Sequence, residues 1–471
     1  MSKIETDIVV LGAGPAGYVC AIRAADLGKK VVCVEFDNLG GTCLNVGCIP
    51  SKALISAAHF VESTKHAADM GFTVDPPKLD LSKLIAWKQG IVNKLTGGIG
   101  MLFKNRNIEW VKGKGSIVNP NTVTVDTADG KVEIKCTDIV LATGSEPAPI
   151  PGFEFCDQVW SSTDALEPKT LPKKLFVIGG GVIGMELGMF YQQVGCEVTV
   201  VEFMDQILPG TDPELVKVVA RKAKKAGMKI HLKSAAKSWK KKGSGVEVVA
   251  EVNGKEQTFE ADAILLTVGR RPMTGDLGLE KVGVKTDKRG FIEVNAQCCT
   301  KTPHIYAVGD ITLGPMLAHK GSAQGLVAAG AIARSPGVAY DPKVVPGVIF
   351  TDPEIATTGL SEADCKEKGI DYKVGRFSFG ANGRAMSMHA TDGMVKVIAD
   401  AKDDTVLGVH MVGPNVTDMI SEGSLAIEGG LTVEDIAMTI HPHPTLSEVL
   451  MEACEDVHGM SPHGMAPRKK K

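Results

Sequence analysis

Two stretches of the chain repeat one pattern of apolar and polar residues. Each begins with a short apolar run, at residues 7–11 and 175–178, that predicts a buried strand of a parallel sheet. A glycine-rich turn, a helical run and a second apolar strand follow, and that strand ends on an acid. The glycines are Gly12, Gly14 and Gly17 in the first copy and Gly179, Gly181 and Gly184 in the second, and the acids are Glu35 and Glu202. The acid follows the first glycine by 23 residues in both copies (12 to 35 and 179 to 202).

This arrangement is typical of a dinucleotide-binding unit. The first glycine permits the tight turn, the second lets backbone N–H groups approach a pyrophosphate, and the third lets helix and strand pack closely. The acid accepts hydrogen bonds from a ribose hydroxyl. One copy alone is a weak signal, but two copies with the same spacing predict two dinucleotide sites. Glu202 would repel a 2′-phosphate and residues 203–206 contain no arginine, so the second site is predicted to bind NAD rather than NADP.

The remaining pattern divides the chain into the segments 1–148, 149–276, 277–346 and 347–471. Buried strands at residues 139–144 and 263–269 each lead into a proline-containing linker, so each is predicted to close its nucleotide-binding unit. Thr143, Gly144 and Gly269 at their ends are candidate cofactor contacts. Residues 43 to about 110 indicate a largely helical insertion. From residue 347, short strands and amphipathic helices (about 361–368, 416–429 and 433–439) predict an α+β domain without a nucleotide pattern.

The pair Cys43 and Cys48 directly follows the first unit. A helical run begins after Pro50, so Cys48 is predicted near a helix N-terminus, where the dipole favours its thiolate. A disulfide between the two would close a small loop and add little stability. Beside a cofactor site, such a bridge indicates redox chemistry. Lys52 lies one helical turn past Cys48 and is predicted to stabilise that thiolate or a reduced flavin.

A second constellation is the motif from His441 to Glu448 near the C-terminus. A histidine with a carboxylate a few residues on is typical of a general base, and here His443 and Glu448 are the candidates. Thr445 or Ser447 is expected to cap the helix that follows. His458 and His463 are interpreted as solvated.

Further candidates lie between residues 298 and 331. Asp310 ends a strand just before a helical run, where it is predicted to bind a ribityl chain. Met316 and Ala318, at the start of that run, are candidate cofactor contacts. The neighbours Cys298 and Cys299 are interpreted as structural, because adjacent residues of a strand point to opposite faces.

Composition and charge argue against a nucleic-acid-binding protein and against a membrane-spanning one. The 471 residues suggest about three domains, and 44% hydrophobic with 23% charged residues is the composition of a globular protein. The net charge of −3 gives no electrostatic case for nucleic acid, and no apolar run is long enough to span a membrane. Eleven scattered cysteines indicate a reducing compartment, with no metal site among them. The first strand begins too early for a presequence, so the cytoplasm is expected, or the mitochondrial matrix if a presequence was removed. The basic residues 468–471 are interpreted as a solvated tail.

These motifs together resemble the pyridine nucleotide–disulfide oxidoreductases, and within that family the enzymes that oxidise dihydrolipoamide. The resemblance runs from about Asp7 to Asp456. It implies an α/β fold with two Rossmann-like dinucleotide-binding domains plus a C-terminal α+β dimerisation domain. Segment 1–148 would bind FAD and carry the redox helix, 149–276 would bind NAD, 277–346 would complete the FAD domain, and 347–471 would form the dimer interface.

The resemblance also implies roles for individual residues. In the family's homodimer, Cys43 would exchange with the lipoyl sulfur and Cys48 would contact the flavin, while His443 and Glu448 would come from the other subunit. Lys52 and Glu186 are similar to an ion pair beside the flavin's reactive nitrogen, Asp310 to the flavin-binding aspartate and Glu35 to the ribose ligand of FAD. The implied partners are lipoyl domains of 2-oxo acid dehydrogenase complexes or of the glycine cleavage system.

Several relatives of that fold fit the sequence less well. A glutathione- or trypanothione-type reductase would need arginines after Glu202. A mercuric or large thioredoxin reductase would carry a cysteine pair in its C-terminal tail, but the last cysteine is Cys454 and stands alone. A soluble transhydrogenase would lack the Cys43–Cys48 pair. A non-enzymatic flavin-binding scaffold would not need the complete set of chemical motifs.

Overall fold

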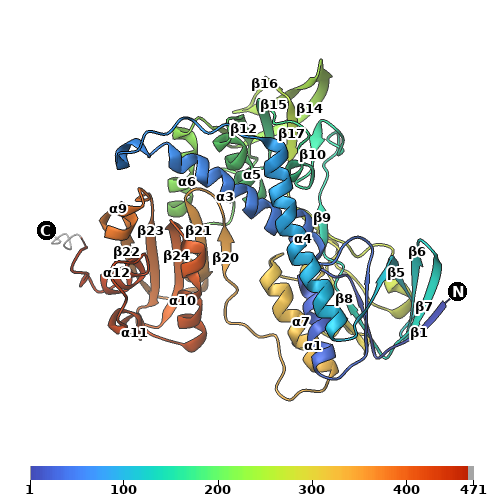
Figure 1. Cartoon of the computed structure of the whole chain (residues 1–471). Coiled ribbons are helices and arrows are strands. Elements are labelled where there is room, and N and C mark those ends of the chain that lie inside the picture. Colours follow the sequence, from blue (N-terminus) through green and yellow to red (C-terminus); the bar gives the residue numbers. More distant parts are fainter. Residues whose placement is uncertain (1, 465–471) are drawn as a thin grey trace.

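The computed structural model describes residues 2–464. Its first parallel sheet has the strand order β19-β8-β2-β3-β4 (Figure 1). These strands are Ile305–Ala307, Asp138–Leu141, Ile8–Leu11, Val31–Glu35 and Glu109–Lys112. Every residue of β2, β3 and β8 is buried, as expected for strands covered on both faces. Helices α1 (Pro15–Asp26) and α7 (Ala318–Ile332) pack together beside this sheet, so residues after 300 complete a unit that begins at residue 8.

A second parallel sheet repeats the arrangement with the order β10-β17-β11-β12-β13. Its strands are Val159–Trp160, Ala263–Leu266, Lys174–Ile178, Glu197–Val201 and Lys229–His231. Helix α5 (Val182–Gln193) joins β11 to β12, and α6 (Pro213–Lys225) leads to β13. In both units the glycine turn therefore lies at the carboxyl end of the first strand, where ligands bind in open α/β sheets.

Antiparallel strands decorate both parallel sheets. A four-stranded sheet, β1-β7-β6-β5, adjoins the first, and a three-stranded sheet, β14-β15-β16, adjoins the second. The former contains Ser2–Glu5, Gly130–Lys135, Thr122–Thr127 and Lys114–Asn119, and the latter Ser234–Lys242, Gly245–Val252 and Lys255–Ala261. A ribbon of β9 (Ser145–Pro147) and β18 (Arg270–Pro272) connects the two linkers that the sequence predicted.

The helical insertion comprises α2 (Gly41–Val46), α3 (Cys48–Thr64) and α4 (Leu81–Asn105). Figure 1 shows α3 and α4 crossing the centre of the molecule between the parallel sheets. Asp80 caps α4 by accepting a hydrogen bond from the Lys83 N–H at 3.1 Å. Because α3 begins at Cys48 itself, the thiol stands at the first position of a helix of 17 residues.

The C-terminal part is an antiparallel sheet of order β20-β21-β24-β23-β22, flanked by helices. The strands are Gly347–Ile349, Glu354–Gly359, Val406–Gly413, Met394–Asp400 and Tyr372–Ser378. The helices are α8 (Glu362–Lys368), α9 (Gly383–Ser387), α10 (Val416–Gly429), α11 (Val433–Met438) and α12 (Glu448–Asp456). Strand β22 was not predicted from the sequence, because Gly375 interrupts the apolar pattern of residues 372–378. A Cβ there would lie 2.0 Å from the Ala453 oxygen, so the glycine is what lets α12 pack on this strand.

The expected capping of α12 is wrong. Neither Thr445 nor Ser447 caps α12 with its side chain: the Thr445 hydroxyl donates to the Pro442 oxygen at 2.7 Å, and Ser447 makes no capping bond. His463 is exposed as expected, and its Nδ1 also lies 2.5 Å from Glu452 Oε1, a contact that raises its pKa. His458 lies 3.6 Å from an Asp404 oxygen. The basic run 468–471 lies outside the described residues.

Candidate active site

The first glycine turn has the geometry of a phosphate-binding loop. Gly12 adopts a φ of +105°, and a Cβ there would meet the Ala142 oxygen at 2.2 Å. A Cβ at Gly17 would lie 1.9 Å from the Gly12 oxygen, so this glycine lets α1 lie against the turn. Gly14 has only the Gly41 Cα, at 4.0 Å, near its missing side chain. Gly12 and Gly17 thus allow close backbone packing, whereas Gly14 leaves space beside the turn. This arrangement fits a dinucleotide pyrophosphate bound at Gly14.

Glu35 fixes this turn from the end of β3. Its Oε2 accepts a hydrogen bond from the Ala13 N–H at 2.8 Å and its Oε1 accepts from the Asp37 N–H at 2.9 Å. Burial raises the pKa of Glu35, and the backbone bonds oppose that shift. Each carboxylate oxygen has a second lone pair, so the side chain retains capacity to accept ribose hydroxyls.

The second glycine turn borders an open cavity of about 580 Å³. A Cβ at Gly184 would lie 2.0 Å from the Gly179 oxygen, whereas Gly181 has nothing within 4 Å. Glu202 Oε2 accepts from the Gly180 N–H at 2.6 Å. Among residues 2–464, the lining consists of glycines, including Gly269, apolar and hydroxyl side chains and Glu202, without an arginine or lysine. This cavity fits a dinucleotide without a 2′-phosphate.

A polar cluster joins the linker strands to the first unit. Asp310 Oδ2 accepts from the Ser145 hydroxyl at 2.6 Å, and Arg270 Nε donates to the same hydroxyl oxygen at 2.8 Å. Burial lowers the pKa of Arg270, while the nearby Asp310 opposes that shift. Thr143 donates from its hydroxyl to the Met273 oxygen at 2.6 Å, and Gly144 has a φ of +74°. Sequence reasoning named Asp310, Thr143 and Gly144 but missed Ser145 and Arg270.

The turn that carries Asp310 lies against the first glycine unit. A Cβ at Gly309 would meet the Ala16 side chain at 3.0 Å, which places Asp310 beside the start of α1. Helix α7 begins at Ala318, two residues after Met316. The buried Lys320 donates to the oxygens of Gly309 and Thr312 at 3.3 and 3.1 Å, so it joins the helix start to this turn. Sequence reasoning gave no signal for Lys320, because a lysine in a helical run indicates a surface position.

Cys43 and Cys48 belong to two consecutive helices broken at Gly47. The segment that leads to them contacts the first glycine turn directly: the Gly40 N–H donates to the Ala13 oxygen at 2.8 Å. A Cβ at Gly41 would lie 2.6 Å from the Gly14 Cα, so only glycine allows this approach. The segment that carries the thiol pair therefore lies against the first glycine turn.

The two thiols have different protonation chemistry. Both thiols are free. The neighbouring Cys43 thiol and the Lys52 ammonium lower the pKa of Cys48 to about 7 against the effect of burial. The neighbouring Cys48 thiol and burial raise the pKa of Cys43. In the reduced pair Cys48 is thus the thiolate and Cys43 the thiol.

Lys52 forms a partly buried ion pair with Glu186 of α5. Lys52 Nζ lies 2.7 Å from Glu186 Oε2, and Glu186 Oε1 accepts from the Phe350 N–H at 2.8 Å. The ammonium also lies 4.5 Å from the centre of the Phe350 ring. Contacts from two distant parts of the chain, at Glu186 and Phe350, therefore hold one positive charge a single helical turn from Cys48.

His443 and Glu448 pair as the sequence predicted. His443 Nδ1 lies 2.8 Å from Glu448 Oε1, and the Thr445 N–H donates to Glu448 Oε2 at 2.8 Å. Burial alone would raise the pKa of Glu448, but these two bonds outweigh it and the pKa is lowered. An ionised Glu448 requires the proton on Nδ1, which leaves the Nε2 lone pair free on a side chain that is 80% exposed. Among the described residues, no hydrogen bond joins His443 to either cysteine of its own chain.

His441, two residues earlier, anchors the same loop. Its Nδ1 lies 2.7 Å from the Thr439 oxygen, its Nε2 lies 2.9 Å from Glu422 Oε1, and the side chain is only 4% exposed. Sequence reasoning included His441 in the motif but missed Glu422, which lies 19 residues away on α10.

Breaking this anchor should impair the His443 loop. In His441→Ala we expect turnover that depends on His443 to fall about 10- to 100-fold, because small misplacements of a reacting group have costs of that order. Reaction steps that need no proton transfer through His443 should change little. His458→Ala, an exposed histidine outside the loop, is the control. Unchanged turnover in His441→Ala would show that the anchor does not position His443.

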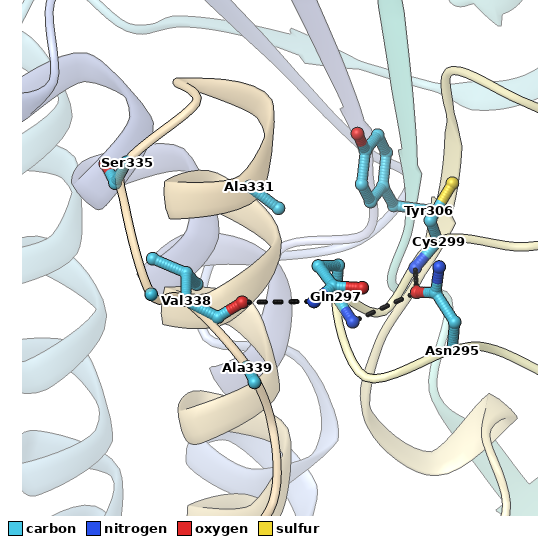
Figure 2. A pocket seen from close by; sticks show the side chains of 9 residues that line it. Asn295, Gln297, Cys299, Tyr306, Ala331, Ser335, Val338 and Ala339 are labelled. Atoms are coloured by element: carbon cyan, nitrogen blue, oxygen red, sulfur yellow. Dashed lines mark hydrogen bonds between the residues drawn. The ribbon is translucent and has the colours of Figure 1, made fainter.

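The Cys298–Cys299 pair is structural for a different reason from the one expected. The two residues lie in a turn rather than a strand, with a φ of +59° at Cys298. Figure 2 shows Cys299 beside a hollow of about 600 Å³, where its backbone N–H donates to Asn295 Oδ1 at 2.9 Å. Burial raises the pKa of Cys298 to about 12 and also raises that of Cys299, so neither favours a thiolate.

Comparison with known proteins decides the family. Residues 6–325 match the family described as pyridine nucleotide-disulphide oxidoreductase. The chain belongs to this family. Residues 345–454 match the dimerisation domain of the pyridine nucleotide-disulphide oxidoreductases, so the C-terminal sheet and its helices are the part of the chain through which the family dimerises. Among the helices of residues 2–464, none has the length and apolar character needed to cross a membrane.

Relatives within the family are similar over almost their whole length. Dihydrolipoyl dehydrogenase of Bacillus subtilis strain 168 is 49% identical over 461 residues, with 98% of each chain covered. The enzyme of the same name from Thermus scotoductus is 45% identical, covering 97% of this chain and 98% of its own. Among solved structures, LpdA from Mycobacterium tuberculosis superimposes with a TM-score of 0.89 at 26% identity, over 97% of this chain and 99% of its own.

Proposed function

We propose that this oxidoreductase is a dihydrolipoyl dehydrogenase that oxidises dihydrolipoamide through Cys43 and Cys48 and passes the electrons by way of FAD to NAD. The observation that carries the proposal is the asymmetric thiol pair: Cys48, with its pKa lowered to about 7 and Lys52 one turn away, beside the first glycine turn. The relatives that share 45–49% identity carry the same name.

We assign FAD to segment 1–148 together with 277–346, NAD to 149–276 and dimerisation to 347–471. Gly12, Gly14, Gly17 and Glu35 would hold the FAD pyrophosphate and ribose, with Asp310, Thr143, Gly144, Met316 and Ala318 along the rest of the cofactor. Gly179, Gly181, Gly184, Glu202 and Gly269 would hold NAD, and Lys52 with Glu186 would lie near the flavin ring. When bound, FAD supplies a two-electron acceptor that can return a hydride to NAD.

The residues of the chain carry the thiol chemistry. The Nε2 of His443 removes a proton from one thiol of dihydrolipoamide, and the resulting thiolate attacks the Cys43 sulfur of the oxidised pair. The Cys43–Cys48 bond breaks and Cys48 leaves as a thiolate, which Lys52 stabilises. Protonated His443 then gives its proton to the departing Cys43 sulfur and takes the proton of the second lipoyl thiol, which attacks the first lipoyl sulfur. The lipoyl disulfide ring closes, Cys43 is left as the protonated thiol, and His443 holds the second proton. Two protons and two electrons have then moved from dihydrolipoamide to the protein.

The proposed substrate is carried by a protein. We expect lipoyl domains of a 2-oxo acid dehydrogenase complex or of the glycine cleavage system to deliver the dihydrolipoyl group. The His443 side chain is 80% exposed, and within residues 2–464 its Nε2 has no hydrogen-bond partner. This favours a homodimer in which His443 and Glu448 complete the cysteine site of the other subunit.

The direct test is a steady-state assay with dihydrolipoamide as reductant and NAD or NADP as acceptor. We expect NAD to be reduced and the kcat/KM for NADP to be lower than that for NAD by at least about 100-fold. The reason is that a 2′-phosphate would meet Glu202 in a cavity whose described lining contains no basic residue. Glu202→Ala should narrow that difference. Absence of dihydrolipoamide oxidation in the FAD-loaded protein would refute the function, and equal use of NADP would refute the cofactor assignment.

A further inference from the structure

A compact group of metal-ligating side chains lies outside the proposed active site. Among residues 2–464, His66, Asp69 and His389 form the one group of three histidine, cysteine or acidic side chains whose ligand atoms all lie within 4.8 Å of one another. His66 Nδ1 is 3.6 Å from Asp69 Oδ2. The rings of His66 and His389 are stacked with their centres 5.8 Å apart and their planes 10° from parallel.

The three residues come from two parts of the fold. His66 follows the end of α3, and Asp69 lies in the short helix η1 (Ala68–Met70), three residues on, which places both side chains on one face of a turn. His389 follows α9 and belongs to the dimerisation domain. Figure 1 shows α9 beside the outer end of α3. The group therefore bridges the helix that carries Cys48 and the part of the chain that carries His443.

We propose that His66, Asp69 and His389 form a surface site for a divalent transition metal such as Zn²⁺ or Cu²⁺. Two imidazoles and one carboxylate match the donor preference of these ions, whereas Ca²⁺ and Mg²⁺ prefer oxygen ligands throughout. Zn–N and Zn–O distances of about 2.0–2.2 Å place the ligands of one ion about 3.3 Å apart. The ligand atoms, which lie within 4.8 Å of one another, must therefore converge by at most about 1.5 Å. All three are exposed and free to rotate into that arrangement.

The bound ion would act as a structural crosslink between two parts of the chain and would take no part in the redox chemistry. Helix α3 ends at Thr64, 16 residues after Cys48 and about 24 Å away along the helix at 1.5 Å per residue, and His66 follows this end. A bound ion would tie the α3–α4 connection to the dimerisation domain. Because an ion that binds only the folded state stabilises it, the thermal unfolding midpoint of the protein with Cys43 and Cys48 oxidised should rise with metal concentration.

The test uses untagged, FAD-loaded protein with Cys43 and Cys48 oxidised, so that neither a tag nor the thiol pair binds the metal. Calorimetric titration with Zn²⁺ should show one site per chain, and His66→Gln, Asp69→Asn and His389→Gln should each weaken it at least tenfold. The electron paramagnetic resonance spectrum of one equivalent of Cu²⁺ should show coupling to two imidazole nitrogens in the wild type and to one in each histidine variant. His458→Gln, an exposed histidine elsewhere, should behave as the wild type.

The two readouts make the proposal refutable even where a variant is less stable. If His66→Gln and His389→Gln keep the wild-type Cu²⁺ spectrum, or if Zn²⁺ binds the variants as tightly as the wild type, the site is not formed by these residues. A variant that fails to fold would be replaced by the milder Asp69→Asn, whose Cu²⁺ spectrum should keep both nitrogen couplings while its Zn²⁺ affinity falls. An unchanged Zn²⁺ affinity in Asp69→Asn would likewise overturn the proposed ligand set.

Discussion

In His443→Gln, turnover of dihydrolipoamide should fall by about 10²- to 10⁴-fold, the usual contribution of a positioned general base. Glutamine keeps a polar side chain of similar reach, but it cannot accept and release the thiol proton at Nε2. The electron path from NADH to the flavin needs no thiol proton, so reduction of an artificial dye by NADH should stay close to the wild-type rate. Stopped-flow and steady-state rates of both reactions measure the separation.

The control for this variant is His458→Gln, which removes an exposed histidine near Asp404 rather than near Glu448. It should leave both reactions unchanged. Equal loss of the dihydrolipoamide and dye reactions in His443→Gln would show a general structural defect and would reject His443 as the thiol base.

Cys48→Ser should abolish both dihydrolipoamide turnover and the long-wavelength absorption that a thiolate gives beside an oxidised flavin. In the two-electron-reduced wild type, this absorption should depend on pH, because the pKa of Cys48 is lowered to about 7. The thiolate predominates above that pH, so the band should be present at pH 8 and should be lost as the pH falls through about 7. Lys52→Met should move the midpoint upward, since the ammonium is one of the groups that lower this pKa.

The matched control is Cys156→Ser, which removes another exposed cysteine far from these motifs in the sequence. It should leave the band and its pH dependence unchanged. A band that survives in Cys48→Ser would assign the flavin contact to another residue, with Cys43 the first to test.

The parts of the fold that sequence predicts best are those in which a local pattern has a local cause. The glycines of the two turns and the acids Glu35 and Glu202 were located correctly because each position is dictated by a steric or hydrogen-bonding need within one strand–turn–helix unit. Cys48 at the start of α3 followed from Pro50 and the helical run after it.

The parts that sequence could not predict depend on contacts between distant segments. Arg270 reaches Ser145 across 125 residues, and Glu422 meets His441 across 19, and neither pair has a spacing that indicates contact. Strand β22 was missed because Gly375 is required by α12, which is about 80 residues later in the chain. The Glu186–Lys52 pair was expected only from family resemblance, since 134 residues separate its members.

The central claim is that Cys43 and Cys48 of one subunit and His443 and Glu448 of the other form one active site. A heterodimer with Cys43→Ser in one subunit and His443→Gln in the other tests it most directly, using two affinity tags to purify the mixed species. If sites are shared, one site of the heterodimer combines both substitutions and the other is intact. The heterodimer should then show about half the wild-type dihydrolipoamide turnover, while each homodimeric variant is nearly inactive. A heterodimer as inactive as its parents would contradict the claim, because each subunit would then supply its own complete site.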